Sequence, residues 1–155
     1  MSKSQIDDIK NSILRYLSMR EHSRLELINK LSKKNFEMDM IVQCLDQFLQ
    51  KKLQSDERYT ESFVRSKYND HKGPSFISAS LKSKGVKVEI IDRYLSKFED
   101  EDWNKTAIEA LHKKSVSKNI SKDKSKEKQK NFLMQRGFRF KTIENAINEY
   151  WKQWI

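Results

Sequence analysis

Hydrophobic and polar residues recur in the same order at three places along the chain, each time around a glycine or an asparagine. Gly85 follows Leu-Lys-Ser-Lys, Gly137 follows Leu-Met-Gln-Arg, and Asn35 follows Leu-Ser-Lys-Lys. Gly and Asn adopt a positive φ at low cost, which suits the residue just beyond a helix C-terminus. The residue after each is apolar and can contact the leucine of the last helical turn. The pattern predicts three helices that end in the same way.

Apolar residues continue beyond each of these stops at steps of three and four, which is the spacing of one helix face. The three sets are Met38, Ile41, Leu45 and Phe48; Val88, Ile91, Leu95 and Phe98; and Phe140, Ile143, Ile147 and Tyr150. The leucines before the stops, Leu31, Leu81 and Leu133, lie 50 and 52 residues apart. A period of this length is typical of tandem modules. Each set therefore predicts the apolar face of a helix that follows the stop.

Each module also shows signals for two earlier helices. In the first module, Ser23-x-x-Glu26 matches a capping box. In the second, Asp56 begins a turn and Pro74 suits the first position of a helix, where its missing N–H is harmless. In the third, the acidic run 99–102 suits a helix N-terminus. The apolar faces of the first helices are Ile13, Leu14, Tyr16 and Leu17; Tyr59, Phe63 and Val64; and Trp103, Ala107, Ala110 and Leu111.

We therefore predict an all-α protein made of three tandem three-helix-bundle repeats that form an elongated, curved array. The expected repeats are residues 1–54, 55–99 and 100–155. The third contains a Lys-rich insert at 113–130, with eight lysines against Asp123 and Glu127. The insert is interpreted as a solvated linker or loop between two helices, and the alternative is a polybasic contact for nucleic acid or an acidic protein surface.

Composition narrows the function classes. The 155 residues carry a net charge of +10 and a mean hydropathy of −0.89, but 16 aromatic residues argue against a disordered chain. There is no long apolar run and only one cysteine, Cys44, on a predicted core face. We expect a basic cytoplasmic monomer with no membrane contact. The three histidines are scattered and the glycines are too few for a phosphate loop, so we expect no metal, no cofactor and no enzymatic activity.

Basic residues lie mainly on the middle helices and the turns, which makes weak non-specific nucleic-acid binding an expectation. The candidate contact residues are Arg20, Arg24, Lys30, Lys33, Lys34, Arg65, Lys72, Lys82, Lys84 and Arg136. Taken singly, each is better explained as a solubilising surface charge.

The modules resemble the RecX family of bacterial regulators of the recombinase RecA. The resemblance covers roughly residues 12–150 and lies in SRLELINKL, in SDERYTESFVR leading into KGPSFISASLKSKGV, and in FLMQRGF. Phe76 stands where that family has a basic residue. The resemblance implies binding without catalysis: insertion into the groove of the RecA filament on single-stranded DNA, and inhibition of ATPase, strand exchange and co-protease activity.

Two alternatives remain open at this point. A helix-turn-helix-like DNA-binding protein would share the helix, stop and helix. However, the outer faces of the predicted third helices carry Asp39, Asp46, Glu89, Asp92, Glu144 and Glu149, which suit a DNA groove poorly. A helical scaffold for another protein would share the fold and differ only in its partner.

Overall fold

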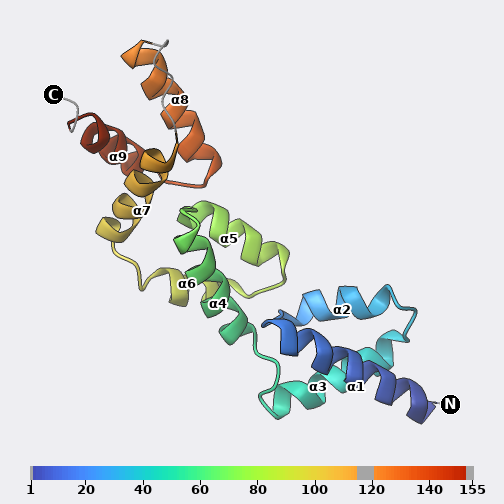
Figure 1. The fold of residues 1–155 in the computed structure, drawn as a ribbon. Coiled ribbons are helices and arrows are strands. Elements are labelled where there is room, and N and C mark those ends of the chain that lie inside the picture. The colour runs from blue at the N-terminus through green and yellow to red at the C-terminus, as the bar shows by residue number, and fades with distance from the viewer. Residues whose placement is uncertain (1, 115–120, 153–155) are drawn as a thin grey trace. The chain divides into compact units, whose positions relative to one another are not determined.

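The computed structural model describes residues 2–114 and 121–152, and within these ranges all regular structure is helical. No described residue lies in a β-strand, which confirms the predicted all-α class. No helix in these ranges is long and apolar enough to cross a membrane. The helices, labelled in Figure 1, are α1 (Ser2–Met19), α2 (Arg24–Ser32), α3 (Met38–Gln50), α4 (Asp56–Asn69), α5 (Pro74–Ser83), α6 (Val88–Leu95), α7 (Asp100–Lys113), α8 (Lys122–Gln135) and α9 (Phe140–Lys152).

The helix order fits the predicted tandem three-helix repeats, while the repeat boundaries and the elongated, curved arrangement stay predictions. Residue contacts divide the chain into two compact units, residues 1–62 with 81–91 and residues 63–80 with 92–155. In unit 1, α1, α2 and α3 pack against one another. Their core consists of Ile9, Ile13, Leu27, Leu31, Ile41, Cys44, Leu45 and Phe48. In unit 2, α7, α8 and α9 pack together in the same pairwise way.

The three predicted helix stops have the expected backbone conformation. Asn35, Gly85 and Gly137 have φ values of 65°, 78° and 91°. Beyond the two glycines, the Val86 amide donates to the Leu81 carbonyl and the Phe138 amide to the Leu133 carbonyl, each at 3.1 Å. These bonds close the Schellman motif by satisfying a carbonyl of the last helical turn.

Two further helix ends share this conformation without a glycine. Lys52 and His71 have φ values of 60° and 61°, after α3 and α4. The amides of Leu53 and Lys72 then donate back to Phe48 and Lys67 at 2.9 Å. The sequence signal was absent because Lys and His do not mark a left-handed position.

The predicted helix starts are confirmed. The Ser23 hydroxyl accepts from the Glu26 amide, and the Glu26 carboxylate accepts from the Ser23 amide, each at 3.1 Å. Pro74 is the first residue of α5, and Asp56 that of α4. At α7 the Glu99 amide donates to the Asp102 carboxylate at 2.8 Å.

Within unit 2, the first turn of α5 lies against the stop that follows α8. The Gly73 amide donates to the Arg136 carbonyl at 2.7 Å, and the Ser75 amide donates to the Gly137 carbonyl at 3.0 Å. A Cβ at Gly73 would lie 2.5 Å from the Gly137 carbonyl group, and one at Gly137 would overlap the Phe76 backbone nitrogen. Both positions therefore need glycine because two backbones meet there.

Four positions on the predicted apolar faces are exposed, which corrects the expectation. The exposed fractions are 50% for Leu14, 49% for Met38, 48% for Val88 and 61% for Phe140. The last three are the first residues of α3, α6 and α9. Side chains in a helix lean toward its N-terminus, so a first-turn residue projects beyond the surface that the neighbouring helices cover.

The linker interpretation of the Lys-rich insert is wrong for its second half. Residues 122–130 form the first nine residues of α8. The Ser121 hydroxyl accepts from the Lys124 amide at 3.3 Å and caps the helix. Ser125, Gln129 and Leu133 are buried at steps of four, so α8 turns an unusually polar face inward, and this face gave no apolar signal. Residues 115–120 of the insert lie outside the described residues.

Candidate basic interaction surface

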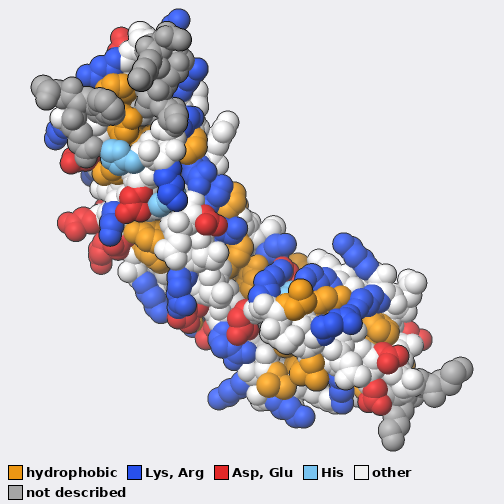
Figure 2. Space-filling model, in the orientation of Figure 1, with side chains coloured by type: hydrophobic (Ala, Val, Ile, Leu, Met, Phe, Trp, Pro, Cys, Tyr) orange, Lys and Arg blue, Asp and Glu red, His pale blue; other side chains and the backbone are white. Residues whose placement is uncertain are grey.

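A shallow groove in unit 1 brings several candidate cations together. It has a volume of about 210 Å³ and lies between α2 and the end of α5. Its lining residues are Leu25, Glu26, Asn29, Lys30, Lys33, Ser83 and Lys84. The α2 members follow steps of four, so they share one side of the helix. Figure 2 shows Lys and Arg side chains around exposed hydrophobic ones over α2.

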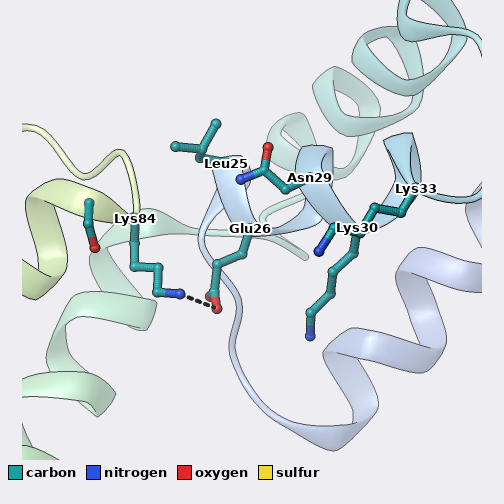
Figure 3. Close-up of a pocket in the computed structure, with 7 residues that line it drawn as sticks. Leu25, Glu26, Asn29, Lys30, Lys33 and Lys84 are labelled. Carbon is teal, nitrogen blue, oxygen red and sulfur yellow. Dashed lines mark ion pairs between the residues drawn. The ribbon is translucent and has the colours of Figure 1, made fainter.

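Glu26 is the buried carboxylate that organises this groove, with 7% of its side chain exposed. It accepts from the Arg20 guanidinium at 2.8 and 3.2 Å and lies 3.8 Å from the Lys84 ammonium (Figure 3). Burial raises the pKa of Glu26, but the hydrogen bonds from Arg20 and Ser23 outweigh burial and leave the pKa lowered. Glu26 therefore stays charged and holds two of the candidate cations in position.

His22 positions a third cation. Its ring is buried, with Nδ1 3.0 Å from the Arg20 carbonyl and Nε2 2.9 Å from the Lys30 ammonium. The carbonyl only accepts and the ammonium only donates, so His22 is neutral with its proton on Nδ1. Burial lowers the pKa of His22, and the positive charges of Arg20 and Lys30 lower it further. The hydrogen bond with the Arg20 carbonyl raises the pKa but does not outweigh these effects.

The Tyr16 ring lies beneath three cations. The Lys30 and Lys34 ammonium groups are 4.9 and 5.1 Å from its centroid, and the Arg15 guanidinium carbon is at 5.7 Å. The hydrogen bond from Lys34 lowers the pKa of the Tyr16 hydroxyl. Cation–π attraction thus offsets part of the repulsion among like charges on this side of unit 1.

Seven of the ten sequence-predicted residues belong to unit 1: Arg20, Arg24, Lys30, Lys33, Lys34, Lys82 and Lys84. Arg24 forms an ion pair with Asp46 at 2.7 Å, and this ion pair links α2 to α3. Lys33, Lys34 and Lys82 are exposed. Unit 1 therefore combines candidate cations held by structural contacts with candidate cations that face solvent.

The other three predicted residues, Arg65, Lys72 and Arg136, belong to unit 2. The Arg136 guanidinium donates to the His71 carbonyl at 2.9 Å and to the Asp70 carbonyl, so it closes the end of α4 and has a structural role. Lys72 lies 4.6 Å from the Phe76 ring centroid. Arg65 is an exposed residue of α4.

Sequence reasoning missed the residues that organise the groove. Glu26 was identified only as a helix cap, although the pairing of a capping-box glutamate with nearby arginines was a usable signal. His22 was set aside because no histidine or cysteine accompanies it at metal-ligand spacing. Its partner Lys30 lies eight residues away on the next helix, and only folding brings the two together.

The fold and the groove together define a class of protein. Tandem three-helix modules carry a basic groove with an apolar residue at its edge, which suits association with a polyanionic or acidic macromolecule. Among the described residues, no cluster of His, Cys, Asp or Glu has the arrangement of a metal site.

Similarity to known proteins identifies the family of this chain. The first three-helix domain of RecX matches residues 10–48, and the second matches residues 55–95. The Regulatory protein RecX of Chromohalobacter salexigens is 34% identical over 143 residues, which cover 92% of this chain and 93% of that protein. That of Legionella pneumophila (strain Corby) is 32% identical over 139 residues, with 90% and 92% coverage. The crystal structure of RecX from Lactobacillus salivarius has a TM-score of 0.80 and 26% identity, and covers 96% of this chain and 97% of that one.

The chain belongs to the RecX family of regulatory proteins. This confirms the resemblance in the sequence and extends it over more than nine-tenths of the chain. The relatives are named as regulatory proteins.

Proposed function

We propose that this protein is a non-enzymatic regulator that binds the groove of the RecA filament on single-stranded DNA. Bound there, it inhibits RecA ATPase, strand exchange and co-protease activity. Membership of the RecX family is the observation that carries the proposal, because the similarity spans nearly the whole length of relatives named as regulatory proteins. This role places the protein in the cytoplasm, where it acts as a monomer.

The unit 1 groove supports contact with a protein partner. Lys30, Lys33 and Lys84 supply positive charge, and Leu25 at the groove edge supplies apolar area that phosphate alone would not need. A filament combines DNA phosphates with protein side chains, and long-range attraction would speed the encounter. Weak non-specific affinity for nucleic acid accompanies this function.

The test is a titration of RecA bound to single-stranded DNA while ATP hydrolysis is followed. The proposal expects inhibition at amounts of this protein well below the stoichiometry of RecA. Unchanged hydrolysis at equal stoichiometry would contradict it. Binding to bare duplex alone, lost steeply with salt, would instead support the rival DNA-binding function.

A charge-reversal pair locates the contact. Lys33→Glu combined with Lys82→Glu changes two exposed cations of unit 1, one lining the groove and one in the last turn of α5, and leaves Glu26 with its partners. Lys10→Glu combined with Lys51→Glu is the matched control, with the same change in net charge on α1 and at the end of α3. We expect the first variant to weaken inhibition at least tenfold more than the second. Equal effects would show that only net charge matters.

A further inference from the structure

The α8–α9 part of unit 2 carries aromatic rings with cations over them. The Lys130 ammonium lies 5.1 Å from the Phe140 ring centroid, and that of Lys122 lies 5.4 Å from the Trp151 ring. The Phe132 ring has both the Lys114 ammonium at 4.3 Å and the Arg136 guanidinium carbon at 5.2 Å. Each end of α8 therefore has aromatic rings with cations close to them.

Phe140 stands out among these rings because 61% of it is exposed. It opens α9 between Arg139 and Lys141, which are also exposed. An exposed phenylalanine among cations favours neither solubility nor core packing. It does offer a flat ring face close to positive charge. This combination is the one that single-stranded nucleic acid requires, since its bases stack on rings and its phosphates pair with cations.

The charge pattern of α8 points to a polyanionic ligand. Residues 122–130 contain five lysines against Asp123 and Glu127. All four pairs of charged residues spaced four apart in this segment are like-charged: Lys122–Lys126, Asp123–Glu127, Lys124–Lys128 and Lys126–Lys130. Such pairs destabilise a helix, and the opposite-charge pairs spaced three apart offset only part of this. Phosphates along α8 would relieve the repulsion among the lysines.

We propose that the α8–α9 face of unit 2 is a binding site for single-stranded nucleic acid, with Phe140 as the ring on which a base stacks. Stacking of a base on an aromatic ring is stronger than an exposed cation–π contact, so a base displaces Lys130 from the ring. The released ammonium then pairs with a phosphate. Lys126 and Lys122 lie four and eight residues before Lys130, so they share its side of α8 and continue the electrostatic track.

This site prefers single strands to duplex. In a duplex the bases are already stacked and paired, so the Phe140 ring gains no partner and only the lysines contribute. The inference deepens the nucleic-acid part of the proposed function. It is tested on DNA without RecA, so its failure would leave the titration of the RecA filament unaffected.

The experiment measures fluorescence anisotropy of a labelled oligothymidine and of a labelled duplex with full-length protein over a range of salt concentrations. Phe140→Ala should weaken binding to oligothymidine about tenfold, leave binding to duplex unchanged and leave the salt dependence unchanged. Phe140→Trp should restore single-strand affinity. Lys130→Gln should lower the slope of log K against log salt on oligothymidine by about 0.7, because one phosphate contact is lost.

Met134→Ala provides the matched control, because Met134 is a 55% exposed apolar residue of α8 without a ring. It should bind oligothymidine like the unaltered protein. The proposal is overturned if Phe140→Ala binds oligothymidine normally, if it loses duplex affinity equally, or if Met134→Ala has the same effect. Displacement of oligothymidine by polyglutamate at equal charge concentration would overturn it in favour of an acidic protein ligand.

Discussion

The Ser23 hydroxyl donates a hydrogen bond to the Lys84 carbonyl at 2.8 Å, across 61 residues of sequence. The same hydroxyl accepts from the Glu26 amide and caps α2. One small side chain therefore starts a helix and ties it to the turn after α5. Nearby, a Cβ added at Gly85 would lie 2.8 Å from the Leu25 Cβ, so this turn and α2 are in close contact.

Removing the Ser23 hydroxyl should destabilise unit 1. Ser23→Ala loses the helix cap and leaves the Lys84 carbonyl without this donor, and we expect a loss of about 2 kcal/mol in the free energy of unfolding. Urea unfolding followed by circular dichroism measures it. Ser121→Ala is the control, because Ser121 caps α8 at an exposed site and should cost only about 0.5 kcal/mol. Equal losses would show that the bond to Lys84 contributes nothing.

Gly137 should tolerate no side chain. Its φ of +91° disfavours any L-residue, and an added Cβ would overlap the Phe76 backbone and Cβ. Gly137→Ala should therefore cost about 3 kcal/mol, combining backbone strain with overpacking. At Asn35, which has a similar φ at an exposed turn, Asn35→Ala should cost only about 1 kcal/mol. Thermal unfolding compares the two, and a Gly137→Ala variant as stable as Asn35→Ala would refute the close contact.

Arg136 should matter for stability through its hydrogen bonds to the His71 and Asp70 carbonyls. Arg136→Ala should lower the free energy of unfolding by about 2 kcal/mol, since hydrogen bonds from a charged donor contribute about that much. Arg139→Ala, which removes an exposed arginine just before α9, should cost about 0.5 kcal/mol. If the two variants unfold at the same urea concentration, Arg136 acts only as a surface charge.

His22 should make stability depend on pH. Its pKa is lowered in the folded state by burial, so below the unfolded pKa of about 6.5 the unfolded chain binds the proton more readily. Stability from this group is complete above about pH 6.5 and is lost as pH falls toward the folded pKa. His22→Gln should therefore lose less stability than the unaltered protein between about pH 7 and about pH 5. The pKa of His71 is lowered as well, but His71 contributes equally to the pH dependence of His22→Gln and of the unaltered protein.

Parallel stability curves for His22→Gln and the unaltered protein across that pH range would contradict this assignment. Urea unfolding at closely spaced pH values gives both curves. A second measurement, the carbon-13 chemical shifts of the imidazole ring, identifies the tautomer directly. The expected result is a neutral ring protonated at Nδ1, as the bonds to the Arg20 carbonyl and the Lys30 ammonium require.

Local chemistry determined most of the fold. Helix stops at Gly85 and Gly137 and starts at Ser23 and Pro74 depend on φ preferences and capping groups within a few residues, so the sequence alone located them. The tandem repeat follows from the same signals at a constant period. Family membership followed as well, because the stretches that carry the resemblance lie largely within the two matched domains, residues 10–48 and 55–95.

Tertiary structure decided which side chains are buried and which charges meet. The apolar pattern placed Phe140 on a core face, yet as the first residue of α9 it is exposed, because a first-turn side chain leans away from the rest of the helix. The pairing of Glu26 with Lys84 joins residues far apart in sequence, and only folding brings them within 3.8 Å. Periodicity reports the face of a helix, whereas burial depends on what packs against that face, and this is settled in three dimensions.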